Sequence, residues 1–188
     1  CLTVLHGEED CVVAGDGPGN VAPGQAVQGQ RHPVGFAGGG VENDQRVSRQ
    51  DGEPFAIVRH ARGRSIVFSG DTAYSAALVE LARGADVLVC EAMHVAATRR
   101  GFDERVAAGA YADNPEGIWK HIVDTHTPLD VAGRMAREAG VGTLVLNHII
   151  PGGWNPELDD DFYRREAARE FAGRILVGRD GMLIEDLK

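Results

Sequence analysis

The chain has 188 residues, of which 43% are hydrophobic and 25% charged, a composition typical of one globular domain with its own core. Its formal net charge of −9 argues against a nucleic-acid surface that works by overall basicity, although a local basic patch is compatible with it. No apolar run is long enough to span a membrane, and three scattered cysteines indicate neither a disulfide framework nor a structural zinc site. We therefore expect a cytoplasmic protein. Because the first residue is cysteine rather than methionine, we also expect an incomplete amino-terminal end.

The first 54 residues differ in composition from the rest of the chain. Leu2–Leu5 fits a short strand, whereas Gly15–Gly40 is rich in glycine, proline and glutamine and shows little apolar periodicity. Such a segment is predicted to pack weakly. We expect a single domain over residues 1–188, in which residues 1–54 are atypical and Gly/Pro-rich and residues 55–188 are well patterned.

Short apolar runs separated by glycine turns define the elements of residues 55–93. Phe55–His60 and Ser65–Phe68 are predicted to form a hairpin, and Val87–Val89 a strand buried on both faces. Between them, Ala73–Arg83 is predicted to form a helix that ends at Gly84. The residues expected on its buried face are Tyr74, Ala77, Leu78 and Leu81.

Two helices are predicted between residues 94 and 124, and a third after them. The first two cover Val95–Arg100 and Ile118–Val123, with a break at Asn114-Pro115. Thr127 is the predicted N-cap of the third, and Pro128 takes its first helical position. Its predicted buried stripe is Ala132, Met135, Ala136 and Ala139, and Gly140 ends it.

The last third of the chain continues the alternation of strand and helix. The predicted elements are a strand at Thr143–Asn147, a helix at Pro156–Ala172, and a hairpin that pairs Arg174–Val177 with Met182–Ile184. Alternating strands and helices indicate an α/β fold with a largely parallel central sheet.

Three side chains that can carry chemistry follow apolar strands within one to three residues. These are Asp71 after Ser65–Phe68, Glu91 after Val87–Val89 and His148 after Thr143–Asn147. Parallel strands would bring all three to one edge of the sheet, and His126 lies in the connection that leads to the last strand. Carboxylates and imidazoles together suit a divalent ion of the zinc type, which lowers the pKa of bound water towards ~7. The pattern therefore predicts a metal-dependent hydrolytic site.

Each of these residues also has a simpler explanation. Asp71 or Thr72 could cap the following helix, and Glu91 could accept hydrogen bonds from loop backbone. The helix predicted to start at Pro128 would place its positive end near His126 and disfavour the imidazolium form. His60, His94 and His121 are expected to have no role in the site.

Two segments resemble the second half of a metallo-β-lactamase-fold hydrolase of the branch that contains ribonuclease Z and arylsulfatase-like proteins. They are SGDTAYSAALVELARGADVLVCEA and HTPLDVAGRMAREAGVGTLVLNHIIPGG, and the resemblance covers about residues 55–185. It implies an αββα layered sandwich whose amino-terminal half is incomplete or degenerate. It also implies that Asp71 of GDT and His148 hold metal, and that Glu91 and His126 assist proton transfer.

The amino-terminal half departs from this family's pattern. The family's HxHxDH motif is not found, since His6-Gly7-Glu8-Glu9-Asp10-Cys11 keeps only one histidine and the aspartate in register. No histidine lies between His32 and His60, where a further metal ligand is expected. Family members hold one or two divalent ions, and we expect at most one well-held ion here.

The resemblance implies a zinc-dependent hydrolase that uses a metal-activated water on a phosphodiester, sulfate or carboxylic ester. The alternative is a non-catalytic or truncated metallo-β-lactamase-fold protein that lacks a complete metal site. The expected partner is a small-molecule or phosphodiester substrate, and a nucleic-acid substrate is implied only by the resemblance. Self-association into a homo-oligomer is left open, and no membrane partner is expected.

Overall fold

The structure, a computed structural model, describes residues 2–5, 11–14, 43–47, 56–61, 64–152, 157–180 and 182–184. These residues fall into two units, one built from residues 1–40 and 179–187 and the other from residues 41–178. The predicted weak packing of Gly15–Gly40 concerns residues outside the described ranges and stays a prediction, as does the expected single domain.

The smaller unit contains a three-stranded sheet in the order β2-β1-β9. β1 (Leu2–Leu5) pairs antiparallel with β2 (Cys11–Ala14) and parallel with β9 (Leu183–Ile184). The strand predicted at Leu2–Leu5 is confirmed. The predicted pairing of Arg174–Val177 with Met182–Ile184 is wrong, because β8 (Arg174–Val177) and β9 belong to different sheets.

The larger unit contains a six-stranded sheet in the order β3-β4-β5-β6-β7-β8. Its antiparallel part consists of β3 (Asn43–Val47), β4 (Ala56–Ala61) and β5 (Arg64–Phe68), which confirms the predicted hairpin. β5, β6 (Val87–Met93), β7 (Thr143–Ile150) and β8 run parallel to one another. Every residue of β6 is buried, as expected for a strand covered on both faces.

The helices α4 (Leu129–Ala139) and α5 (Asp160–Ala168) pack against the parallel part of this sheet, on β6, β7 and β8, whereas α1 (Ala76–Leu81) contacts β4. α4 contacts both other helices and buries its predicted stripe of Ala132, Met135, Ala136 and Ala139. Gly140 ends α4 in the left-handed conformation (φ 67°), which costs a residue without Cβ little. The predicted α/β fold class is confirmed.

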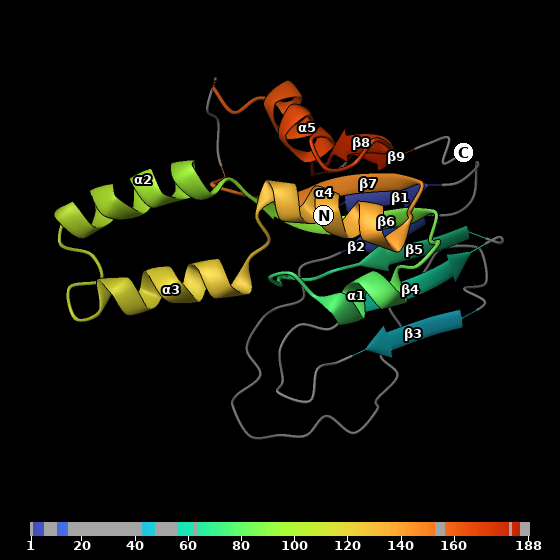
Figure 1. Cartoon of the computed structure of the whole chain (residues 1–188), viewed down its shortest axis with the longest axis horizontal. Helices are drawn as coiled ribbons and strands as arrows, with labels where there is room; N and C mark the ends of the chain where they lie inside the picture. The colour runs from blue at the N-terminus through green and yellow to red at the C-terminus, as the bar shows by residue number, and fades with distance from the viewer. Residues whose placement is uncertain are drawn as a thin grey trace. The chain divides into compact units, whose positions relative to one another are not determined.

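The helices α2 (Val95–Ala107) and α3 (Pro115–Thr125) lie side by side and project beyond the sheet (Figure 1). The break predicted at Asn114-Pro115 is correct, because Asn114 caps α3 through a 3.0 Å bond from the Gly117 N–H and Pro115 occupies its first turn. Both helices are longer than their sequence periodicity indicated. No helix in the described part of the chain is long and apolar enough to cross a membrane.

The buried face predicted for α1 is wrong by part of a turn. Leu78, Val79 and Ala82 are buried, whereas Tyr74 and Ala77 are exposed. Tyr74 lies before the helix, where its hydroxyl donates to Glu138 at 2.9 Å and the Arg134 guanidinium lies 4.7 Å from its ring centroid. These partners come from α4, which local periodicity in α1 does not reveal.

Candidate functional site

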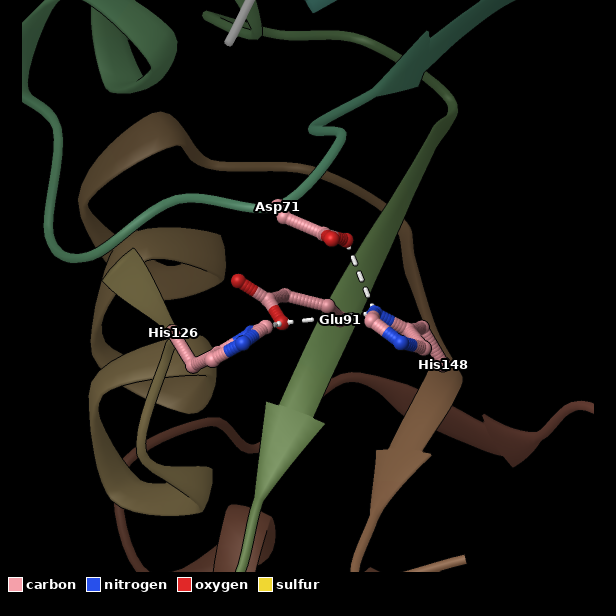
Figure 2. A group of neighbouring side chains, drawn as sticks. All are labelled: Asp71, Glu91, His126 and His148. Carbon is pink, nitrogen blue, oxygen red and sulfur yellow. Dashed lines mark hydrogen bonds and ion pairs between the residues drawn. The ribbon is translucent and has the colours of Figure 1, made fainter. Parts of the chain in front are cut away.

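Asp71, Glu91, His126 and His148 lie together beyond the carboxyl end of β5 and along the last residues of β6 and β7 (Figure 2). One potential ligand atom from each residue lies within 4.8 Å of those from the other three. The neighbouring, parallel placement of β5, β6 and β7 causes this convergence. The predicted meeting of these side chains at one sheet edge is confirmed.

A tight turn after β5 presents Asp71. The Ser69 N–H donates to the Val89 carbonyl at 2.9 Å, and the Ser69 hydroxyl donates to the Gly70 carbonyl at 2.7 Å. Gly70 has a φ of 62°, which glycine adopts readily. The Asp71 side chain is 56% exposed. The N-cap of α1 is Ser75, whose hydroxyl accepts from the Leu78 N–H at 3.2 Å, so neither Asp71 nor Thr72 caps this helix.

A β-bulge in β7 presents His148. Asn147 pairs with Glu91 and Ile149 with Ala92, so His148 is an extra residue in the ladder. Its φ is 38°, in the left-handed region that non-glycine residues seldom occupy. The bulge directs the imidazole towards Asp71, and Nδ1 donates to Asp71 Oδ1 at 2.7 Å. Strained backbone of this kind is concentrated at functional sites.

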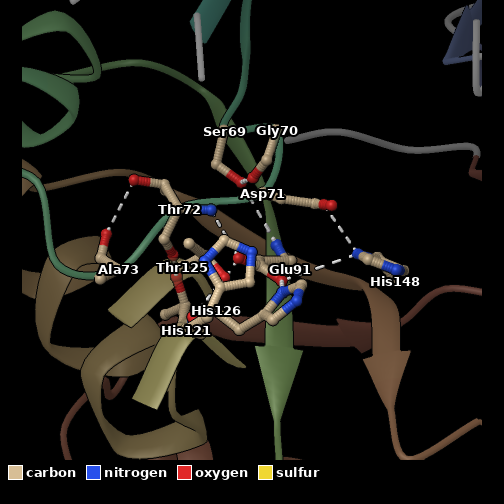
Figure 3. A network of polar contacts seen from close by, with 11 residues as sticks. Ser69, Gly70, Asp71, Thr72, Ala73, Glu91, His121, Thr125, His126 and His148 are labelled. Carbon is tan, nitrogen blue, oxygen red and sulfur yellow. Dashed lines mark hydrogen bonds and ion pairs between the residues drawn. The ribbon is translucent and has the colours of Figure 1, made fainter. Parts of the chain in front are cut away.

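The Glu91 carboxylate is almost fully buried and has donors on both oxygens (Figure 3). Its Oε1 accepts the Thr72 N–H at 2.6 Å and the Thr127 N–H at 3.2 Å. Its Oε2 lies 2.6 Å from His126 Nδ1 and 3.6 Å from His148 Nδ1. Glu91 therefore accepts bonds from loop backbone, as its simpler explanation required, and it also contacts His126, while its predicted part in proton transfer stays a prediction.

His126 lies at the end of a helix rather than at the beginning of one. It is the C-cap of α3, and the first residue of α4 is Leu129. The expected disfavouring of the imidazolium is wrong, because the hydrogen bond to Glu91 raises the pKa of His126. The negative end of α3 acts in the same direction.

Burial raises the pKa of the Glu91 carboxyl, although the bonds from His126 and Thr72 oppose this effect. The neighbouring Asp71 charge adds to this rise. An ionised Oε2 can only accept a hydrogen bond, so the 2.6 Å contact places the hydrogen on Nδ1 of His126. This leaves Nε2 as the nitrogen of His126 that can take up or release a proton.

The donor set fits a divalent metal ion. Carboxylate oxygen and imidazole nitrogen are the ligands of the zinc type, at about 2.0–2.2 Å from the ion. Asp71 and His148, with side chains 56% and 48% exposed, can adjust to such distances. Glu91 has both oxygens engaged by protein donors, so it supports the site rather than offering a free ligand.

Among the described histidines, His94 and His121 are not part of this cluster. His94 is the N-cap of α2, where Nδ1 accepts from the Ala97 N–H at 3.3 Å, and burial lowers its pKa. His121 is exposed on α3. The side chains of His60 and of the segment from His6 to Cys11 lie outside the described part, so the expectation that this segment builds no complete metal site stays a prediction.

Sequence reasoning missed the role of two threonines. Thr127 was predicted as an N-cap, but α4 has Pro128 at that position and no side-chain cap. The buried Thr127 hydroxyl instead donates to the Thr72 carbonyl, so it joins the two loops whose N–H groups hold Glu91. Local patterns cannot indicate a bond between residues 55 positions apart.

Curated relatives match the chain in sequence. It is 35% identical to the ribonuclease Z of Mycobacterium avium over 139 residues, which is 72% of this chain and 44% of the relative. It is 36% identical to the ribonuclease Z of Mycobacterium tuberculosis strain H37Rv over 118 residues, which is 63% of this chain and 38% of the relative. The chain thus spans less than half the length of these relatives. No family model matches it.

Two solved structures are similar at lower identity. The metallo-β-lactamase-fold protein YhfI from Bacillus subtilis has 24% identity and a TM-score of 0.48, covering 68% of this chain and 42% of that one. The short form of human tRNase Z has 22% identity and a TM-score of 0.36, covering 56% and 34%. The sequence match to the mycobacterial proteins identifies the chain as a partial, ribonuclease Z-like metallo-β-lactamase-fold protein.

Proposed function

We propose that this chain supplies metal-binding and proton-transfer groups to a metal-dependent hydrolase that cleaves phosphodiesters. The observation that carries the proposal is the meeting of Asp71, Glu91, His126 and His148, whose potential ligand atoms lie within 4.8 Å of one another. The choice of phosphodiesters is supported by the ribonuclease Z relatives, because ribonucleases cleave RNA phosphodiesters. Sulfate and carboxylic esters are the alternative substrates to be tested beside them.

Asp71 and His148 are the proposed metal ligands. They are the two exposed members of the cluster, and they already lie 2.7 Å apart at Oδ1 and Nδ1. When bound, a zinc-type ion lowers the pKa of a coordinated water and so supplies a nucleophile near neutral pH.

Glu91 and His126 are the proposed proton-transfer pair. Glu91 holds the Nδ1–H of His126 at 2.6 Å and stabilises its protonated form. The proton at Nε2 would then pass to the leaving oxygen as its bond to phosphorus breaks. A positioned acid of this kind contributes about 10²–10⁴-fold to a rate.

A non-catalytic role is the second candidate. Among the described side chains of the cluster, two are exposed donors, whereas a catalytic zinc site has three protein ligands. A scaffold with too few ligands would bind metal weakly and leave esters intact.

The proposed function is tested by hydrolysis assays on the Zn²⁺- or Mn²⁺-loaded chain. The substrates are bis(p-nitrophenyl) phosphate, a short RNA, p-nitrophenyl sulfate and p-nitrophenyl acetate. We expect hydrolysis of the phosphodiesters and a fall in kcat of about 10²–10⁴-fold in Glu91→Gln and His126→Asn. The exposed His121→Ala serves as the matched control and should keep the wild-type rate.

Circular dichroism melting of each variant separates loss of chemistry from loss of fold. A folded, metal-loaded chain that hydrolyses none of the four substrates would favour the non-catalytic role. Unchanged rates in both Glu91→Gln and His126→Asn would remove the proton-transfer assignment.

A further inference from the structure

A cavity of about 290 Å³ lies between α2, α3 and the end of β7. Its apolar lining comes from Phe102, Tyr111, Ile122, Ile150 and Pro151. Ligand pockets are typically concave and mostly apolar, with volumes from roughly 300 Å³ upward. The cavity is therefore of a size for one ring system with a substituent, not for a folded polymer.

His126 connects this cavity to the candidate site. It is one of the residues that line the cavity, while its Nδ1 contacts Glu91 at 2.6 Å and its ring centroid lies 5.6 Å from that of His148. A group held in the cavity would thus lie beside the side chain that we propose to protonate the leaving oxygen.

Stacked aromatic rings form one wall of the cavity. Phe102 and Tyr111 are nearly parallel, with an interplanar angle of 7° and centroids 5.3 Å apart. Trp119 lies against the same Phe102 ring, with centroids 5.5 Å apart. Phe102 is buried, whereas Tyr111 is 37% exposed and offers surface to a ligand. Aromatic walls of this type bind planar rings by stacking, with little dependence on which ring it is.

Arg105 gives the cavity a positive charge. It lines the cavity and is exposed, and among the described residues it forms no ion pair. Arg99, one turn and a half away on the same helix, is by contrast paired with Asp103 at 2.8 Å and Glu116 at 3.6 Å. An unpaired guanidinium at the mouth of an apolar cavity favours an anionic group, and its planar donors match a phosphate.

We propose that this cavity is the leaving-group subsite, where a planar aromatic or nucleobase ring that carries a phosphate docks beside His126. The ring would lie against the Phe102–Tyr111 wall and the phosphate would meet Arg105. This inference rests on the proposed function, because it assigns the ring to the group that leaves when His126 donates its proton. The phosphate at Arg105 is a second, uncleaved phosphate of that group, since the cleaved phosphate stays with the other product.

The test measures binding to the metal-free chain in chelator, so that it requires no catalysis. The probes are uridine 5′-monophosphate, phenyl phosphate and ribose 5-phosphate. Their binding is measured by ligand-observed NMR titration. We expect at least one ring-bearing probe to bind at least tenfold more tightly than ribose 5-phosphate, which has no aromatic ring. Preference for the nucleotide would indicate a nucleic-acid source of the leaving group, and preference for phenyl phosphate a leaving group that is a phosphorylated aromatic alcohol. Equal affinity of all three probes would overturn the proposal.

Gly101→Leu tests the location. Gly101 lines the cavity on α2, and a Cβ built on it meets no atom within 4 Å, so a side chain added there begins in open space and should narrow the cavity. Leucine also favours helix over glycine, so the fold should be kept. We expect binding of the preferred ring probe to weaken at least tenfold. The matched control is Ala96→Leu at an exposed position of α2 that does not line the cavity, and it should bind as the wild type does.

Arg105→Gln should weaken binding of the phosphate-bearing ring probe about tenfold. It should leave the binding of uridine, which has no phosphate, unchanged.

Wild-type binding by Gly101→Leu, with its fold confirmed by thermal melting, would overturn the assignment of the cavity. If the chain hydrolyses phosphodiesters but binds no ring, the subsite alone fails. If it binds the ring through this cavity but hydrolyses nothing, the proposed function alone fails.

Discussion

The Glu91 carboxylate owes its geometry to the loops around it. The N–H groups of Thr72 and Thr127 reach Oε1, and the bond from the Thr127 hydroxyl to the Thr72 carbonyl holds these two loops together. Thr127 is fully buried, so the carbonyl it satisfies has no access to water as a substitute. A single hydroxyl therefore supports the position of the residue that orients His126.

Thr127→Val removes this hydroxyl while keeping the shape of the side chain. We expect the free energy of unfolding to fall by about 1–3 kcal/mol, because the Thr72 carbonyl is left buried without its donor. Chemical denaturation measures the change. The matched control is Thr125→Val, whose hydroxyl bonds the exposed His121 carbonyl and whose loss should cost less than about 0.5 kcal/mol. Equal costs at the two positions would contradict this role of Thr127.

At the scale of elements, the carboxylate of Asp86, just before β6, hydrogen-bonds to the first residues of β5. Asp86 accepts from Arg64 at 2.8 Å and from the Ser65 N–H at 2.8 Å and hydroxyl at 3.2 Å. Partial burial raises the pKa of Asp86, but the bonds from Ser65 and Arg64 outweigh it and lower the pKa below its ordinary value. The ionised carboxylate therefore stabilises the pairing of the two strands that present Asp71 and Glu91.

Asp86→Asn should lower the free energy of unfolding at pH 7 by about 1–2 kcal/mol, since the bond to Arg64 loses its charge. Because the pKa of Asp86 is lower in the folded than in the unfolded state, its ionised carboxylate stabilises the fold. This stabilisation is complete above the unfolded-state pKa of about 3.9 and is lost as the pH falls through the folded-state pKa. The difference between wild type and variant should therefore shrink below about pH 4 in denaturation curves. Asp103→Asn, at an exposed pair with Arg99, is the control and should cost less than about 0.5 kcal/mol at any pH. A difference that stays constant into acid would refute the assignment.

Elements whose pattern is local were predictable from the sequence. The apolar runs of β5, β6 and β7 fixed the strands, and with them the edge where Asp71, Glu91 and His148 meet. Contacts between distant segments were not predictable, because periodicity does not report them. Tyr74 faces α4 instead of the core, and β9 pairs with β1 instead of β8. The bulge at His148 was not predicted either, because it depends on the register of β7 against β6.

At the scale of the whole molecule, the chain spans less than half the length of these ribonuclease Z relatives. Its net charge of −9 opposes the approach of a long polyanion, so any attraction for phosphate has to come from local groups such as Arg105. The number of metal ions that the chain holds is the property that reports most directly on the completeness of the site.

We expect the chain to hold at most one divalent ion. Asp71 and His148 are exposed donors 2.7 Å apart, whereas both oxygens of Glu91 are occupied by protein donors, so the described cluster offers ligands for a single ion. Elemental analysis after dialysis against zinc should give no more than about one ion per chain, since an ion needs about three protein ligands. His148→Ala should reduce the content to background, and the exposed His121→Ala should retain it. Two tightly held ions per chain would show that residues beyond the described cluster complete a second site, and would strengthen the catalytic proposal over the non-catalytic one.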